Sequence, residues 1–183
     1  MRSQHRAVLS VADIQLEMTG YVLVRQPSDI RLVALNDFGN TLFEVLRNPM
    51  REDRVVNNTL PIPSRILAKT VLCDVETIYL KWPSPSALLV RYSDNTIGLV
   101  EKSSDGSMEE FRFDGKNLLL KSYSKAKNNC YLYQTDFSDY QQFAGQSKLL
   151  PRTIRIKDHR MKYELMVSIL NLKPDRLDDI FFR

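Results

Sequence analysis

Residues 60–85, LPIPSRILAKTVLCDVETIYLKWPSP, carry the only convincing helix signal in the chain. Ser64 is expected to cap the N-terminus of this helix. The segment Trp82-Pro83-Ser84-Pro85 is expected to end it, because a residue that precedes proline disfavours helical backbone. The apolar side chains between these ends recur at spacings of three and four, namely at Ile66, Leu67, Val71, Val75, Ile78 and Tyr79. The pattern predicts a helix of about 17 residues with one apolar face.

The residues before this helix have the pattern of short strands. Apolar and polar side chains alternate from Ala12 to Met18, which is typical of a half-buried strand. Thr19-Gly20 interrupts the alternation, and three further strands are predicted at 21–25, 30–35 and 41–46. The loop 36–40 contains Gly39 and favours a hairpin connection. Residues 48–60 are polar and are expected to lead from the strands to the helix.

The residues after the helix return to strand patterns. Turn-forming segments such as Ser93-Asp94-Asn95, Ser104-Asp105-Gly106 and Asp114-Gly115 separate them. Seven strands are predicted here: 87–92, 96–102, 109–113, 117–123, 130–135, 150–157 and 163–170.

Together these patterns predict the fold class. Short connections favour antiparallel pairing, because parallel neighbours need long crossovers. We expect an α+β domain with a strongly curved antiparallel sheet of about 10–11 strands, wrapped as an incomplete barrel around one main helix. The prediction assigns residues 1–172 to this single domain. Residues 173–183 are a tail or a short docking helix, since Leu177, Ile180 and Phe181 have helical spacing.

Composition excludes several classes of protein. No apolar run reaches the roughly 18 residues of a membrane span. The 26 Lys and Arg exceed the 22 Asp and Glu by four, and charges of both signs are interleaved along most of the chain. Only residues 152–162 are locally basic, either as the solvated face of a strand or as a surface for anionic lipid or another acidic partner. Tyrosines near Lys125 and Lys127 are typical of strands, so we expect no nucleic acid partner.

The residues that commonly perform chemistry are sparse. The chain has only two histidines, which are too few to favour a metal cluster or a His-based mechanism. Cys73 and Cys130 are predicted to be buried free thiols, or one long-range disulfide in an oxidising compartment. Asp74 and Glu76 do not share a helix face, so no paired-carboxylate mechanism follows. We therefore expect no enzyme, no catalytic residue, no metal and no cofactor.

The order of these segments resembles a known family. Leu60 to Ala68 opens a helix that closes at Leu80-Lys81-Trp82-Pro83, strands follow, and Leu150 to Ile154 leads to a hairpin at Tyr163. Arg31 to Leu35, with Gly39 and Leu42-Phe43 after it, adds to the likeness. Over roughly residues 7 to 172 the chain is similar to the uncharacterised bacterial lipoproteins related to LolB.

This resemblance implies a half-barrel like those of LolA and LolB, with helical elements over a cavity for acyl chains. Such proteins are typically periplasmic or anchored in the outer membrane, often beside genes for polyene or fatty-acid-like synthesis. A signal segment and a lipid-attachment cysteine, which belong to the family pattern, are not recognised in this sequence. We expect a periplasmic or outer-membrane-associated location, with a cytoplasmic location as the alternative. The loop 36–40 is also too short for the protruding membrane loop of LolB, although Phe38 at its tip is a candidate membrane contact.

The resemblance and the apolar helix face together predict a site. We expect a hydrophobic cavity between the curved sheet and the helix, where burial of an acyl chain gains roughly 0.8 kcal/mol per methylene. The candidate lining residues are Ile66, Leu67, Val71, Val75, Ile78 and Trp82. The expected function is binding or carriage of a lipid, a lipoprotein acyl chain or a polyene-type chain. The alternative is an interaction module with a filled core, or an accessory factor for acyl or polyene synthesis or envelope assembly.

Overall fold

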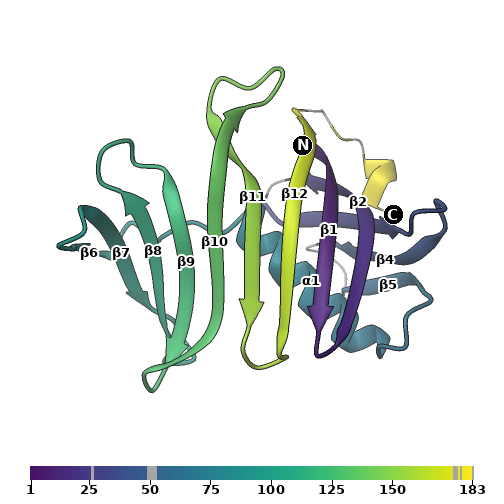
Figure 1. Cartoon of the computed structure of the whole chain (residues 1–183), viewed down its shortest axis with the longest axis horizontal. Coiled ribbons are helices and arrows are strands. Elements are labelled where there is room, and N and C mark those ends of the chain that lie inside the picture. The colour runs from purple at the N-terminus through teal and green to yellow at the C-terminus, as the bar shows by residue number, and fades with distance from the viewer. Residues whose placement is uncertain (26, 49–52, 175–176, 178, 183) are drawn as a thin grey trace.

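A computed structural model describes residues 1–25, 27–48, 53–174, 177 and 179–182. These residues form one 12-stranded antiparallel sheet, which is curved and not closed, with one α-helix against its inner face (Figure 1). The strands are β1 (Arg2–Val11), β2 (Ile14–Arg25), β3 (Asp29–Leu35), β4 (Thr41–Arg47), β5 (Arg54–Asn58), β6 (Leu88–Arg91), β7 (Thr96–Lys102), β8 (Met108–Asp114), β9 (Leu120–Lys127), β10 (Cys130–Gln142), β11 (Leu149–Asp158) and β12 (Tyr163–Lys173). The α+β class and the incomplete-barrel architecture are confirmed.

The strand order explains the position of the helix. The sheet runs β5-β4-β3-β2-β1-β12-β11-β10-β9-β8-β7-β6, so β1 lies in the middle and pairs with the last strand. The chain moves outward by short connections from β1 to one edge, at β5. It then crosses the sheet through helix α1 (Ser64–Tyr79) to the opposite edge, at β6, and returns strand by strand. One long crossover in an antiparallel sheet therefore places α1 against the middle strands (Figure 1).

The C-terminal end of α1 was predicted correctly, and the capping residue at its N-terminal end was not. The Ser64 cap is wrong, because Pro63 is the N-cap residue and no side chain caps the helix. Ser64 is already helical, and its Oγ lies 3.3 Å from Asn58 Nδ2 as an acceptor. At the other end the Leu80 N–H donates to the Glu76 carbonyl at 2.8 Å, and the helix stops before Trp82-Pro83 as expected.

Several strand predictions differ from the structure. β9 begins at Leu120 rather than at residue 117, and β10 extends to Gln142 rather than ending at 135. Gly20 does not break the alternation, because β2 is one continuous strand that pairs with β1 from Ile14 to Leu23. Residues 2–11 and 54–58 are also strands, which brings the total from the expected 10–11 to 12. Their patterns are unlike ordinary strands, since β1 buries the polar Ser3 and His5, and β5 is a polar edge strand.

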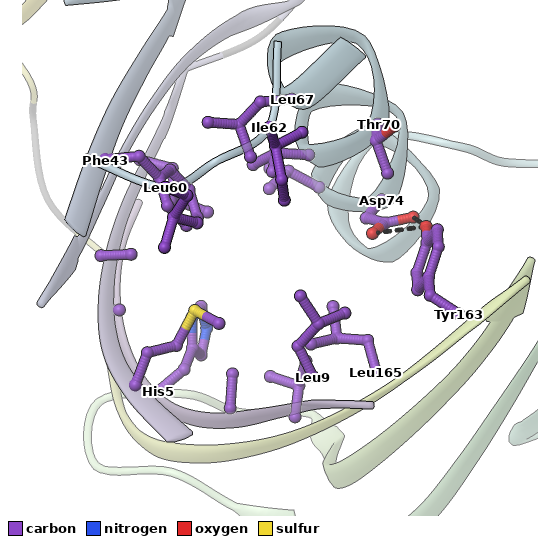
Figure 2. Close-up of a pocket in the computed structure, with 18 of the residues that line it drawn as sticks. His5, Leu9, Phe43, Leu60, Ile62, Leu67, Thr70, Asp74, Tyr163 and Leu165 are labelled. Atoms are coloured by element: carbon purple, nitrogen blue, oxygen red, sulfur yellow. Dashed lines mark hydrogen bonds between the residues drawn. The ribbon is translucent and has the colours of Figure 1, made fainter. Parts of the chain in front are cut away.

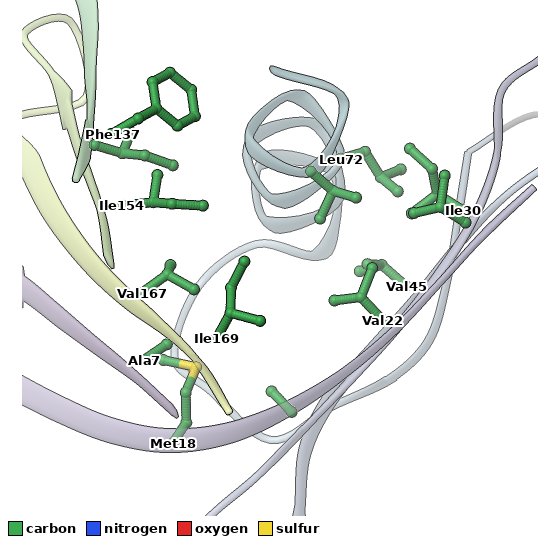
Figure 3. Packing of buried hydrophobic residues seen from close by; sticks show 14 of the residues in the cluster. Ala7, Met18, Val22, Ile30, Val45, Leu72, Phe137, Ile154, Val167 and Ile169 are labelled. Carbon is green, nitrogen blue, oxygen red and sulfur yellow. The ribbon is translucent and has the colours of Figure 1, made fainter. Parts of the chain in front are cut away.

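The hydrophobic core lies between α1 and the inner face of the sheet. Figure 3 shows Leu72 of α1 on the helix face that looks toward Ile30 and Val45, and all three are fully buried. Ile154 and Ile156 of β11 continue this core toward β10. Burial of such side chains is the main stabilising contribution to a domain of this size.

The described residues near the C-terminus pack against the outer side of β3 and β4. Leu177 and Phe182 are buried with Leu46 in a second, smaller cluster, and a short 3-10 helix, η1 (Asp179–Phe182), carries Phe182. The Arg25 guanidinium lies 4.7 Å from the centre of the Phe182 ring. Within residues 173–183, of which 175–176, 178 and 183 lie outside the described residues, η1 is the described helical turn, and a docking role for this segment stays a prediction.

The prediction that both cysteines are buried free thiols is wrong about their burial. Cys73 and Cys130 are both free, and both are exposed rather than buried. Cys73 lies on the helix between the buried Leu72 and Asp74 but is itself exposed, and Cys130 follows the turn at Asn128-Asn129.

Candidate functional site

A cavity of about 370 Å³ lies between α1 and the inner faces of β1, β2, β3 and β12. Its size falls within the range of about 300–1,000 Å³ that is usual for small-molecule pockets. Most of its lining is aliphatic, and Figure 2 shows Leu9 and Leu165 on the sheet side opposite Leu67 of the helix. Phe43 of β4 and the segment Leu60–Pro63 before the helix cover a third side.

The cavity exists because small residues meet in the sheet beneath the helix. The strand register places His5, Gly20, Ala34 and Phe43 in one row across β1 to β4, and the two middle members have almost no side chain. A Cβ added to Gly20 would lie 3.9 Å from His5 Nδ1, which is ordinary contact. Glycine is therefore not required there by crowding, and its effect is to leave space.

The structure places five of the six predicted lining residues at this cavity. Ile66, Leu67, Val71, Val75 and Ile78 all line it. Trp82 does not: it follows the end of α1, and its side chain is 68% exposed. Phe38, the candidate membrane contact, is 90% exposed at the tip of the turn between β3 and β4.

A neutral polar cluster occupies one end of the cavity. His5 Nε2 lies 2.7 Å from Ser3 Oγ and is also hydrogen-bonded to the Tyr79 hydroxyl. The Tyr79 hydroxyl in turn donates to Ser3 Oγ at 3.2 Å. Burial lowers the pKa of His5 to about 4, so the imidazole is uncharged at neutral pH.

A carboxyl group occupies the opposite end. Asp74 Oδ1 accepts hydrogen bonds from the hydroxyls of Tyr133 at 2.7 Å and Tyr163 at 2.8 Å. Burial raises the pKa of Asp74 to about 7, although the two tyrosine hydroxyls and Arg160 act in the opposite direction. Figure 2 shows the Asp74–Tyr163 contact at the edge of the cavity. Sequence reasoning missed this group, yet Asp74 lies three residues after Val71 and four before Ile78, on the apolar face.

A second cavity of about 450 Å³ adjoins the first. It shares Ile66, Thr70, Asp74, Met161 and Tyr163 with the apolar cavity. Its remaining lining is polar and comes from α1, from the last residue of β11 and from the turn that follows it: Arg65, Lys69, Cys73, Asp158 and Arg160. The apolar cavity therefore ends beside a charged one.

The described residues contain no group of three or more His, Cys, Asp or Glu side chains placed to hold a metal ion. Among them, no helix combines the length and the hydropathy that a bilayer-spanning segment requires.

Comparison with known proteins identifies the fold by structure and not by sequence. By sequence, neither a protein-family model nor a curated protein matches this chain. By structure, it is similar over its full length to a LolA superfamily protein from Nitrosomonas europaea, with a TM-score of 0.64, 9% identity and 89% of that chain covered. It is also similar to a DUF1329 family protein from Desulfovibrio piger, with a TM-score of 0.59, 14% identity and coverage of 100% and 88% of the two chains.

A third solved structure is described as an outer membrane lipoprotein-sorting protein domain from Vibrio parahaemolyticus. It matches with a TM-score of 0.54 and 10% identity, and the match covers 99% of this chain and 88% of that one. At these identities the likeness establishes the fold, which is LolA/LolB-like.

Proposed function

We propose that this chain, whose fold is LolA-like, binds a hydrophobic ligand in the cavity under α1 and carries it without catalysing a reaction. The ligand class is a lipid, a lipoprotein acyl chain or a polyene-type chain. The observation that supports this proposal most directly is the aliphatic cavity of about 370 Å³ above Gly20 and Ala34.

The energetics of the cavity favour an apolar occupant. An aliphatic void leaves its lining without dispersion contacts on one side, and it is a poor site for water. An alkyl chain that fills it gains roughly 0.8 kcal/mol per buried methylene. The polar groups at its two ends already have partners, since Ser3 and Tyr79 engage His5, and Tyr133 and Tyr163 engage Asp74. An apolar chain can therefore enter without leaving the Tyr79 hydroxyl or the Asp74 carboxyl group unpaired.

The polar groups at the two ends of the cavity are hydrogen-bonded to other side chains of the protein. His5 Nε2 is hydrogen-bonded to the hydroxyls of Ser3 and Tyr79, and Asp74 accepts from Tyr133 and Tyr163. We assign no reaction, cofactor or metal to this site.

We place this activity at the bacterial cell envelope, in the periplasm or at the outer membrane. The support is the LolA-like fold, together with the lipoprotein-sorting description of the Vibrio domain. The exposed Phe38 is the candidate point of membrane contact, because a single aromatic at a turn tip can enter the interfacial region.

A second candidate function is a protein-interaction module, and strand β6 supports it. β6 is an edge strand in the described sheet, and Leu88 and Leu89 are 72% and 62% exposed on its two faces. An apolar edge of this kind can accept a strand from a partner. This candidate requires no ligand in the cavity.

Native mass spectrometry of the purified protein, followed by solvent extraction, tests the first proposal. We expect a co-purified amphiphile, or uptake of added lipid, in the wild-type protein. Gly20→Leu places a side chain in the cavity without a backbone clash, so this variant should be folded and free of ligand. Thr19→Leu adds bulk on the other face of the same strand and should keep the ligand. A wild-type protein that neither carries nor takes up any lipid would favour the interaction module.

A further inference from the structure

The charged cavity beside the apolar one has an excess of positive groups. Three cations line it, Arg65, Lys69 and Arg160, against two carboxyl groups, Asp74 and Asp158. Both carboxyl groups are buried, whereas the cations reach solvent. The side chains that an entering molecule meets first are therefore basic.

The partners of these groups leave Arg65 and Lys69 as the cations of this cavity without an ion pair in the described residues. Asp158 is occupied, because its carboxylate accepts from the Arg160 guanidinium at 2.8 Å and from the backbone N–H groups of Arg160 and Met161. Asp74 accepts from two tyrosines. In the described part of the chain, Arg65 and Lys69 form no ion pair, although they lie four residues apart on one face of α1. Two like charges at this spacing destabilise a helix slightly when nothing neutralises them.

The basic groups lie beside the boundary between the two cavities. Ile66, Thr70 and Asp74 lie on α1 at the boundary of both cavities, and Arg65 and Lys69 precede Ile66 and Thr70 in the sequence. Figure 2 shows Thr70, Asp74 and Tyr163 grouped at one edge of the apolar cavity. A molecule whose chain fills that cavity thus places its terminal group beside Arg65 and Lys69.

We propose that the ligand is an amphiphile with an anionic headgroup, a carboxylate or a phosphate, which Arg65 and Lys69 bind with Arg160 at the mouth of the cavity. This inference rests on the proposed function, since it assigns the headgroup of the same ligand. Arginine supplies a planar pair of donors that fits carboxylate or phosphate oxygens, and lysine adds a point charge. The two cations on α1 are then neutralised only in the complex.

Three probes that share a twelve-carbon chain and differ in the charge of the headgroup test this inference: dodecyl phosphate, dodecyl maltoside and dodecyltrimethylammonium. Each is titrated into the protein by calorimetry, below its critical micelle concentration. We expect dodecyl phosphate to bind about tenfold more tightly than the cationic probe, as charge-assisted hydrogen bonds imply. The double variant Arg65→Gln/Lys69→Gln should lose about tenfold in affinity for dodecyl phosphate and keep its affinity for dodecyl maltoside within about twofold.

The matched control is Lys148→Gln/Arg152→Gln, which removes two exposed positive charges outside both cavities. It should bind dodecyl phosphate like the wild type. An equal loss in both double variants would mean a non-specific charge effect and overturn the inference. Equal affinity for all three probes would also overturn the inference about the headgroup, but it would still agree with the proposed function. Binding of none would refute the proposed function itself, and inorganic phosphate binding as tightly as dodecyl phosphate would indicate a free-anion site.

Discussion

At the scale of single residues, Asp74 is the least expected feature of the molecule. It is an acidic side chain on the apolar face of α1, 5% exposed, and its carboxylate depends on two tyrosines that are distant in sequence. A buried carboxyl group is costly unless it is hydrogen-bonded or protonated. The arrangement therefore links the helix to β10 and β12 through Tyr133 and Tyr163.

Substitutions at Asp74 measure how much these hydrogen bonds contribute to the stability of the fold. Asp74→Ala leaves two buried tyrosine hydroxyls without an acceptor, and each unpaired group costs about 1–3 kcal/mol. We expect the free energy of unfolding in urea to fall by about 2–5 kcal/mol in Asp74→Ala. Asp74→Asn keeps a carbonyl acceptor and should lose less than half as much. Equal losses in the two variants would show that the hydroxyls do not depend on this acceptor.

At the scale of elements, α1 and most strands follow from local patterns. The stripe from Ile66 to Ile78 predicted a helix whose apolar face meets the sheet, and it does. Three elements did not follow in this way. β1 buries Ser3 and His5, which interrupts its alternation, and Gly20 lies inside β2, although glycine usually ends or weakens a strand. β5 is a polar edge strand in a segment expected to be a connection. The departures in β1 and β2 lie at or beside the candidate site.

The short helix η1 allows a matched test of an element. Phe182 is 1% exposed against Leu46 and Leu177, whereas its neighbour Phe181 is 40% exposed. Phe182→Ala should lower the free energy of unfolding by about 3 kcal/mol, because it opens a cavity in the smaller cluster. Phe181→Ala should lower it by less than about 1 kcal/mol. Chemical denaturation of both variants gives the comparison, and a similar small loss in each would mean that η1 contributes little to the fold.

At the scale of the whole molecule, two buried groups set opposite dependences of stability on pH. The pKa of His5 is lowered to about 4 in the folded state from 6.5, so its contribution to stability rises with pH across that interval. The pKa of Asp74 is raised to about 7 from 3.8. Its contribution is fully present below pH 3.8 and is lost as pH rises through about 7.

Urea unfolding between pH 4 and pH 6.5 should therefore separate the two groups. In the wild-type protein the contributions of His5 and Asp74 oppose each other. In Asp74→Asn, stability should rise across this interval by on the order of 3 kcal/mol, and in His5→Gln it should fall by a similar amount. If both variants followed the same slope as the wild type, neither group would be responsible for the pH dependence.

The amino-acid sequence by itself determined the types of element, because alternation and helical spacing arise from neighbours a few residues apart. It also determined the antiparallel pairing, through short connections, and most of the helix residues that face the cavity. Only the tertiary structure decided where space remains and which polar groups meet there. Gly20 and Ala34 adjoin through strand register, and Asp74 meets Tyr163 across 89 residues of chain. Such contacts depend on how distant segments pack, which no local pattern encodes.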